Sequence, residues 1–333
     1  MRTIRKAALM KAALLGAMAL GLLVVAPAGA AEWKPSRNVE LVVGAGAGGS
    51  IDAQARLIAQ AIERHKLIDT TMTVVNKPGA GSSQAISYLG GHAGDGHYIT
   101  LLASSWIGTA ILMNKPNTFK EVTPLARLFD VPLGFIVKAD SPLKTTKDLA
   151  EALKKDPGAY RFAISTTAGN NNHLAVLRFA QLVGVDPKKV RVIVNDSGAT
   201  SLTQMLGGHL EICVCGIGDT QSLAKAGQIR YLGSLRDEPI PGFENIPTVK
   251  SQGYDVSIAT FYTMVAPKGV SPEIVGYWTD VLAKAIATPE VKNAAEQLGM
   301  TIERVDAATT AAFITNEREV TSKRLGEFGF VQK

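Results

Sequence analysis

The sequence predicts an α/β protein in which mostly parallel sheets are covered by helices. Its main pattern is a short apolar strand, then a turn of small polar residues, then an amphipathic helix, and this order recurs along the chain. Strands that alternate with helices through short turns form parallel sheets. The strand-to-helix turns of such sheets gather at the carboxyl ends of the strands, where ligands bind. The length of the chain is enough for two lobes of ordinary domain size.

The first such unit runs from Val39 to Ile62. Leu41 to Val43 is typical of a buried strand, and apolar residues recur at helical spacing from Ile51 onward. Ser50 fits the N-cap position, and Asp52 suits the dipole in the first turn. Because unpaired backbone N–H groups converge at such a junction, it can hold an anion without lysine or arginine. We expect half of a ligand site here.

A second interpretation of the same loop is a nicotinamide dinucleotide site. Gly44, Gly46 and Gly49 match the fingerprint G-x-G-x-x-G between a strand and a helix. That fingerprint also needs an acidic residue at the end of the next strand, to hold the ribose hydroxyls. The next strand, Met72 to Val75, ends in Asn76. We therefore expect no cofactor.

The chain begins with the features of an export signal. An apolar segment from Ala12 to Val25 precedes small residues and a predicted cleavage after Ala30. The basic residues before or within it are Arg2, Arg5, Lys6 and Lys11. The apolar segment is short for a membrane span. These features predict a protein exported to the periplasm.

The charge balance argues against nucleic acid as a partner. The formal charge is +6, and four positive charges lie in the signal, which leaves +2 for the mature chain. No lysine or arginine cluster alternates with aromatic residues. We expect neither nucleic-acid binding nor a polybasic membrane surface.

The two cysteines, Cys213 and Cys215, are separated by one residue. On a strand both side chains point to one face, near the long limit for a relaxed disulfide. We interpret them as small buried thiols, with a redox or metal pair as the alternative. No Cys-x-x-Cys motif and no spaced histidine supports a metal site.

Later turns repeat the opening pattern. Each follows a predicted strand and precedes a predicted helix, and each is rich in capping residues. These turns are Thr166 to Asn172, Asn195 to Thr200 and Gly216 to Thr220. The chain therefore offers several backbone donors at one sheet edge.

No catalytic motif is present. The chain has no Gly-x-Ser-x-Gly elbow, His-Glu-x-x-His, Ser-x-x-Lys or Walker lysine loop. The five histidines are scattered without metal-ligand spacing, and only His173 lies at a turn of interest, where it either packs and caps or contacts a ligand. The residues predict binding, with no catalytic or metal-ligating group.

An ordered set of motifs spans the mature chain. The motifs are Gly48 to Asp52 with Ala55 and Arg56, Val75 to Gly81, Asp95 to Tyr98, Ser165 to His173, Ser197 to Ala199, Leu206 to Gly208, Ile246 to Val249, Gly253 with Tyr254, and Ala266 to Val270. This set resembles the periplasmic receptors of tripartite tricarboxylate transporters, often called Bug proteins.

The resemblance implies a type II periplasmic-binding-protein fold: two lobes with mixed, mostly parallel sheets around a central cleft that closes on a small carboxylate. It implies delivery of that carboxylate to membrane transporter subunits by a receptor that is monomeric by default. The expected segments are a signal at 1–30, lobe one at 31–132 plus 231–333, and lobe two at 133–230. The expected crossings lie near Leu128 to Leu133 and Ile229 to Ser234, and the expected C-terminal helices are Ser271 to Ile286 and Glu290 to Leu298.

The resemblance also implies the ligand-binding residues. Lobe one would contribute a turn that holds a carboxylate and a floor beneath it, and lobe two would close from the other side. The implied residues are Gly48, Gly49, Ser50, Asp52, Ser104, Ser105, Trp106, Ser165, Thr166, Thr167, Gly169, His173, Ser197, Gly198, Ala199 and Asp219. Asp52 would orient N–H groups and water, because facing carboxylates repel each other.

Some positions leave the ligand open. Family members often carry an aromatic residue before Gly198, where this chain has Ser197. Trp106 is either an aromatic platform for a planar ligand or a packing residue. Asp196 and Asp219 either meet a ligand ammonium or cap helices.

Two other classes of protein remain alternatives. A ligand-binding sensor that docks to a membrane kinase would share this fold. An exported enzyme acting on a small acid would need a catalytic side chain that no motif nominates.

Overall fold

The computed structural model describes residues 33–303 and 305–331. The predicted signal segment lies outside the described residues. The fold below is that of the unit that begins at Lys34. Its strands are β1 (Val39–Val43), β2 (Met72–Asn76), β3 (Tyr98–Ala103), β4 (Val122–Lys138), β5 (Arg161–Ser165), β6 (Arg191–Asn195), β7 (Ile212–Gly216), β8 (Ile229–Ser234), β9 (Ala259–Pro267) and β10 (Thr301–Ile302).

The helices alternate with these strands as the sequence predicts for the first two thirds of the chain. They are α2 (Ser50–Arg64), α3 (Ser83–Gly90), α4 (Ser105–Leu112), α5 (Thr146–Lys155), α6 (Asn171–Leu182), α7 (Gly198–Leu206), α8 (Gln221–Lys225), α9 (Pro272–Ile286), α10 (Pro289–Gln297) and α11 (Ala307–Glu327). A short 3₁₀ helix, η4 (Gly218–Thr220), follows β7.

The strands form a mixed sheet in the order β2-β1-β3-β9-β4-β7-β5-β6, with β8 and β10 also paired to β4. β1 is parallel to β2 and β3, and β5 is parallel to β6 and β7. The central strands β4 and β9 are antiparallel to each other and to their neighbours. The parallel strands are therefore the outer ones, and each parallel set carries its own strand-to-helix turns.

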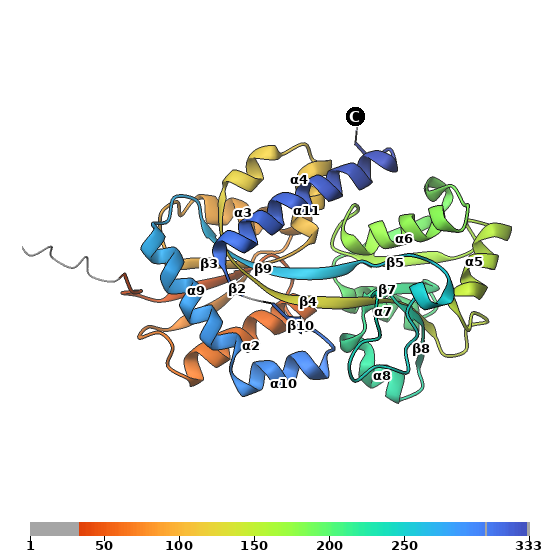
Figure 1. Cartoon of the computed structure of the whole chain (residues 1–333), viewed down its shortest axis with the longest axis horizontal. Helices are drawn as coiled ribbons and strands as arrows, with labels where there is room; N and C mark the ends of the chain where they lie inside the picture. Colours follow the sequence, from red (N-terminus) through yellow and green to blue (C-terminus); the bar gives the residue numbers. More distant parts are fainter. Residues whose placement is uncertain (1–32, 304, 332–333) are drawn as a thin grey trace, which may run out of the picture. The chain divides into compact units, whose positions relative to one another are not determined.

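The long strand β4 serves both sets. It pairs with β9 from Val122 to Pro132 and with β7 from Leu133 to Val137. The change of partner falls at Pro132, which lacks the N–H donor of an ordinary ladder residue. We call β1 to β3, β9, β10 and Val122–Pro132 the first half, and β5 to β8 with Leu133–Lys138 the second half. Figure 1 shows β4 and β9 running side by side from one half to the other.

Helices cover both faces of each half, because the strands are apolar on both sides. In the first half, α2, α9 and α10 lie on one face and α3, α4 and α11 on the other (Figure 1). In the second half, Phe135 and Phe162 pack toward α5 and α6, while Ile136 and Cys213 pack toward α7 and α8. The alternation follows from the two-residue period of a strand. Within the described residues no helix is both long and apolar enough to span a membrane.

The chain returns to the first half later than the sequence predicts. β8 pairs with Gly134–Lys138 of β4, and so belongs to the second half. The segment after β8 still packs with the core of the second half through Leu235, Val249, Val256 and Ile258. β9 makes the return, so residues 231–258 lie with the half that the sequence analysis limited to 133–230.

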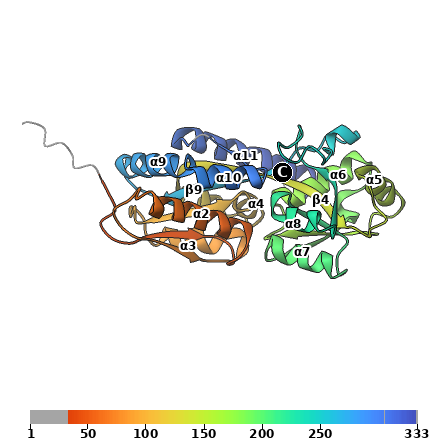
Figure 2. The same cartoon turned by 90° about the horizontal axis from the view of Figure 1, so that it is seen from below.

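The last helix, α11, contacts both halves. Near its start, Phe313 and Ile314 pack with the core of the first half. Near its end, Leu325 and the following Phe328 pack with the core of the second half. Figure 2 shows α11 extending along the molecule from α9 toward α6. The predicted C-terminal helices correspond to α9 and α10, whereas α11 was not predicted.

Candidate functional site

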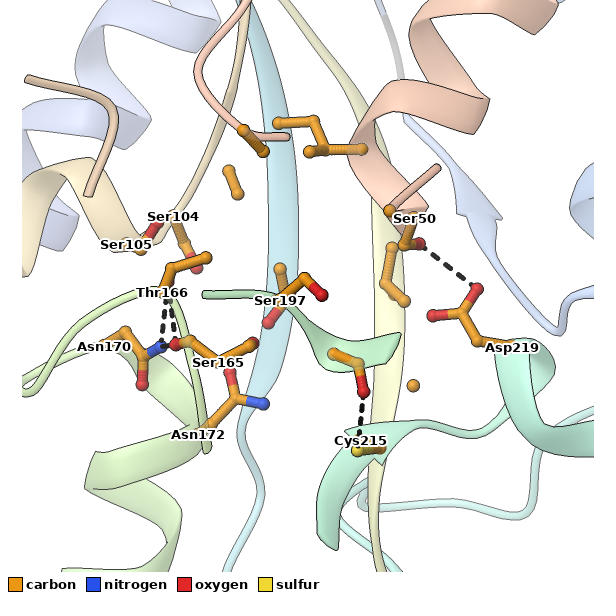
Figure 3. A pocket seen from close by; sticks show the side chains of 18 of the residues that line it. Ser50, Ser104, Ser105, Ser165, Thr166, Asn170, Asn172, Ser197, Cys215 and Asp219 are labelled. Carbon is orange, nitrogen blue, oxygen red and sulfur yellow. Dashed lines mark hydrogen bonds between the residues drawn. The ribbon is translucent and has the colours of Figure 1, made fainter. Parts of the chain in front are cut away.

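A cavity of about 90 Å³ lies where the two halves face each other (Figure 3). A cavity volume of about 10–15 Å³ is enough for one water molecule, so the space suits a small ligand. The lining residues are Ala45, Gly46, Gly49, Ser50, Ile51, Ala103, Ser104, Ser105, Val131, Leu133, Ser165, Thr166, Asn170, Asn172, Asp196, Ser197, Gly198, Cys215, Gly216, Asp219, Thr260 and Tyr262. Both halves therefore contribute walls.

The loop before α2 is held by Asp52, which is 2% exposed and does not line the cavity. The carboxylate accepts hydrogen bonds of 2.9 Å from the Gly48 N–H, the Arg56 Nε–H and the Asn76 side-chain amide. Burial opposes ionisation of Asp52, but these three donors outweigh it and lower its pKa. Asp52 thus fixes the loop through these hydrogen bonds without lining the cavity. Asn76 occupies the position where a dinucleotide site would need an acid.

Four helices of the described chain begin at the cavity wall. α2 and α4 start without a side-chain cap, and their first residues, Ser50 and Ser105, line the cavity. α7 is capped by Ser197, whose hydroxyl accepts the Thr200 N–H at 3.1 Å. α6 is capped by the Asn170 side-chain oxygen. Helix N-termini carry free N–H donors and partial positive charge, so the wall attracts anions.

The turn after β5 has an uncommon backbone conformation. Thr166 has φ of 68°, a left-handed value that a threonine rarely adopts. Its N–H donates to the Asn195 carbonyl at 2.7 Å, and the Asn170 amide donates to the Ser165 carbonyl at 2.5 Å. These bonds tie the turn to β6 and to the start of α6. Because strain of this kind persists where surrounding bonds enforce it, the turn presents its side chains in a fixed arrangement.

A chain of hydrogen bonds crosses between the halves beside the cavity. The Tyr262 hydroxyl donates to Ser50 Oγ at 3.1 Å. Ser50 Oγ in turn donates to Asp219 Oδ1 at 3.2 Å (Figure 3). The Asp219 side chain is accessible from the cavity, but many protein atoms surround its carboxylate. This burial raises the pKa of Asp219, and the hydrogen bond from Ser50 opposes the rise. Burial, and then the charge of Asp219, raises the pKa of Tyr262.

The family of the chain follows from comparison with known proteins. The family model described as tripartite tricarboxylate transporter family receptor matches residues 54–328. The chain belongs to this family. The predicted resemblance is therefore confirmed, and so is the solute-receptor class that it implies.

Relatives and solved structures agree with this assignment. The "UPF0065 protein in gbd 5′region" of Cupriavidus necator is 28% identical over 287 residues, which cover 85% of this chain and 84% of the relative. A TctC solute binding protein from Polaromonas, solved without ligand, is 27% identical with a TM-score of 0.65 over 88% of this chain and 99% of its own. An R. palustris protein solved with adipate is 22% identical with a TM-score of 0.79 over 89% and 98%. The predicted two-lobed binding-protein fold is thus confirmed.

Nine of the residues predicted for the receptor site line the cavity. They are Gly49, Ser50, Ser104, Ser105, Ser165, Thr166, Ser197, Gly198 and Asp219. Gly48 and Ala199 line an adjoining cavity that shares part of the same wall. Asp52, Trp106, Thr167, Gly169 and His173 line neither cavity.

Trp106 is a packing residue in this receptor. Its side chain is 1% exposed and stacks obliquely against Phe119, with ring centroids 4.9 Å apart, in the core of the first half. The position just inside α4 turns the ring toward the core, whereas the neighbouring Ser105 lines the cavity. The structure therefore corrects the interpretation of Trp106 as an aromatic platform.

His173 also faces the core. Its Nδ1 accepts the Gly169 N–H at 2.9 Å, and its ring meets Phe330 edge to face at 5.2 Å between centroids. Burial lowers its pKa to about 4, so the ring is neutral at pH 7. The packing alternative considered for His173 therefore holds, and ligand contact through this side chain does not.

Thr167 and Gly169 lie at a contact between the halves. A Cβ on Gly81 would come within 3.1 Å of Thr167 Cγ2, and a Cβ on Gly108 would overlap the Gly169 carbonyl oxygen. These two loop residues pack against the first half beside the cavity. They therefore contact the other half without lining the space.

The cysteines differ from the expected thiols. Cys213 and Cys215 are joined to each other in the structure, with their Cα atoms 5.4 Å apart. This separation lies within the range of disulfides. Cys215 lines the cavity, and the described residues contain no cluster of His, Cys, Asp or Glu that could hold a metal.

Several lining residues were missed by the sequence analysis. Tyr262, Val131 and Leu133 come from the central strands, which pattern analysis treats as core. Asn170 and Asn172 lie in a turn whose capping residues are evident in the sequence, but no pattern assigns them to the ligand. These side chains form one wall only because the two halves face each other in the folded protein.

Proposed function

We propose that this receptor captures a small carboxylate in the cavity and passes it to the membrane subunits of a tripartite tricarboxylate transporter. The main support is that the N-termini of four helices meet at one small cavity within the described chain. These helices are α2, α4, α6 and α7. Their N–H groups and dipoles can bind a carboxylate without a basic side chain. An R. palustris protein of the same fold was solved with adipate, which supports a carboxylate as ligand.

The two lobes of the proposed clamp are residues 34–132 with 259–331, and residues 133–258. This division keeps lobe two of the sequence analysis but extends it past 230, on the strength of the β8 pairing. β4, β9 and α11 connect the lobes. Opening would then be a rotation about these elements, with each sheet kept intact.

The proposed place of action is the periplasm, after removal of a signal that ends near Ala30. The basic and apolar pattern of the first 30 residues supports export. The receptor is proposed to act as a monomer, since one chain supplies both walls of the cavity. It is proposed to bind without turnover, because the described lining residues offer hydroxyls, amides and the carboxylates of Asp196 and Asp219, but no histidine or lysine as a base.

Thermal unfolding with a ligand panel tests the proposal. Residues 31–333 are unfolded and refolded to remove carried ligand, then heated with monocarboxylates, dicarboxylates, tricarboxylates, amino acids and NAD. A ligand at a hundred times its dissociation constant adds about 2.7 kcal/mol of stability, which raises the midpoint by a few degrees. We expect such a shift with at least one class of acid. No shift with any acid, or a shift with NAD alone, contradicts the proposal.

A matched pair of variants locates the binding. Gly198 is the first residue of α7 and lines the cavity, and a Cβ added there would meet no atom of the described residues within 4 Å. Gly198→Asp places a competing carboxylate at this helix N-terminus, whereas Gly198→Asn adds nearly the same volume without charge. We expect the aspartate variant to fold normally and to lose the ligand shift much more completely than the asparagine variant. Equal loss in both would assign the effect to volume.

A further inference from the structure

The charged side chains in the cavity wall are all acidic within the described residues. Among the described residues that line it, Asp196 and Asp219 carry carboxylates, and no lysine, arginine or histidine is present. A dicarboxylate would therefore meet helix N-termini at one end but a carboxylate of the protein at another. Like charges at such short range repel strongly where protein displaces water.

Asp219 retains acceptor capacity that the protein does not fill. Among the described residues, the side-chain donor that reaches it is the Ser50 hydroxyl, at 3.2 Å. An ionised carboxylate has about four acceptor sites. Gly216 lines the cavity beside it, and a Cβ there would come within 2.5 Å of Asp219 Oδ2. The missing side chain at Gly216 thus leaves room for this carboxylate at the wall.

The opposite end of the cavity favours an anion. Figure 3 shows Ser104, Ser105 and Thr166 on the side away from Asp219. Ser105 is 4% exposed, and its hydroxyl has no hydrogen-bond partner among the described residues. A buried hydroxyl without a partner costs free energy, so a ligand oxygen that reaches this group would gain a hydrogen bond with it. The uncapped start of α4 supplies backbone donors at the same place.

We propose that the ligand is a short amino acid, with its carboxylate at the Ser104 and Ser105 end and its ammonium group against Asp219. The inference rests on the proposed capture of a carboxylate and adds the class of acid. Val131 and Leu133 line the space and would contact the apolar carbons between the two charged groups. Asp196 also lines the cavity and makes the wall as a whole more acidic.

A matched set of ligands tests the charge preference. Butyrate, succinate and 4-aminobutyrate share a four-carbon chain and a carboxylate, and differ in carrying a methyl, a carboxylate or an ammonium group at the far end. Alanine and β-alanine extend the set to shorter separations. Titration calorimetry on the refolded mature chain should show an amino acid binding at least about tenfold more tightly than succinate, since the ion pair forms in a partly desolvated cavity.

Asp219→Asn identifies the residue responsible. The amide keeps the size of the side chain and can still accept from Ser50, but it removes the charge. We expect the preference for the amino acid over succinate to fall by about tenfold or to reverse. Asp280→Asn removes the same charge from an exposed position on α9 and should leave the preference unchanged.

The outcomes separate this inference from the proposed function. Tight binding of succinate or another dicarboxylate, with no gain for any amino acid, overturns the amino-acid inference and leaves carboxylate capture standing. A preference that survives Asp219→Asn also overturns the role given to Asp219. If no member of the set binds and the wider panel of acids gives no shift, the proposed function itself fails.

Discussion

Gly108→Ala should weaken ligand binding without destabilising the fold. Gly108 lies in α4 of the first half, and its Cα faces the Gly169 turn of the second half. A Cβ there would overlap the Gly169 carbonyl oxygen and lie 2.9 Å from the carbonyl carbon. Both neighbours are backbone atoms, so a rotamer change cannot relieve the overlap. The two halves must separate locally instead.

The size of the effect follows from this overlap. Overpacking of this kind costs about 1–3 kcal/mol, and the cost falls on the arrangement in which the halves touch. If ligand binds that arrangement, the apparent affinity falls by about 5- to 150-fold. When the halves are apart the overlap is absent, and the variant gains stability, because alanine is favoured over glycine inside a helix by about 1 kcal/mol.

Calorimetry and small-angle scattering measure the two consequences. The dissociation constant should rise for Gly108→Ala, and its radius of gyration with ligand should exceed that of the wild type. Gly276→Ala is the control, because Gly276 lies in α9, is exposed and has no atom of the described residues near its Cβ position. It gains the same helix propensity away from the contact. Equal affinity in the two variants would refute the reasoning that contact of the halves accompanies binding.

Two further predictions concern stability and pH. Burial lowers the pKa of His173 from 6.5 to about 4, so unfolding takes up a proton between these values. The free energy of unfolding should therefore fall by up to about 3 kcal/mol as the pH drops from 6.5 toward 4. Denaturant titrations at pH 7 and pH 4.5 measure this fall, and His173→Gln should remove most of it. An equal fall in the variant contradicts the assignment. Asp52→Ala removes the charged acceptor of three hydrogen bonds and should cost about 2–3 kcal/mol at pH 7, against little for the exposed control Asp69→Ala. Because folding lowers the pKa of Asp52, its contribution to stability is complete above the unfolded pKa of 3.8 and is lost as the pH falls through the pKa of the folded state. If Asp52→Ala still destabilises the protein in strong acid, the role given to the charge is wrong.

Much of the candidate site could be predicted from local patterns. The run from Leu41 to Ser50 encodes a strand, a glycine turn and a helix start within a few residues, so neighbours along the chain suffice to define it. The same holds for the turns at Ser165 and Ser197. Parallel topology then places the ends of such strands at one edge, as the lining by all three turns shows.

Orientation was harder to predict, as Trp106 illustrates. Adjacent residues at a helix start differ by about 100° in direction, so Ser105 can line the cavity while Trp106 enters the core. Nothing in the sequence specifies which of the two faces the other half. His173 is a similar case, because its partner is the N–H of Gly169 and its packing neighbour, Phe330, lies far along the chain.

The sequence alone determined the α/β class, the strand-to-helix turns and the family, because these depend on short-range periodicity, capping and ordered motifs. The tertiary structure decided the rest: the partner change of β4 at Pro132, the late return through β9, and α11 across both halves. It also decided that Tyr262 and Asp219, distant in sequence, meet at Ser50. The physical reason is that a cavity wall is defined by which surfaces face each other, and contacts between distant segments leave no periodic mark in the chain.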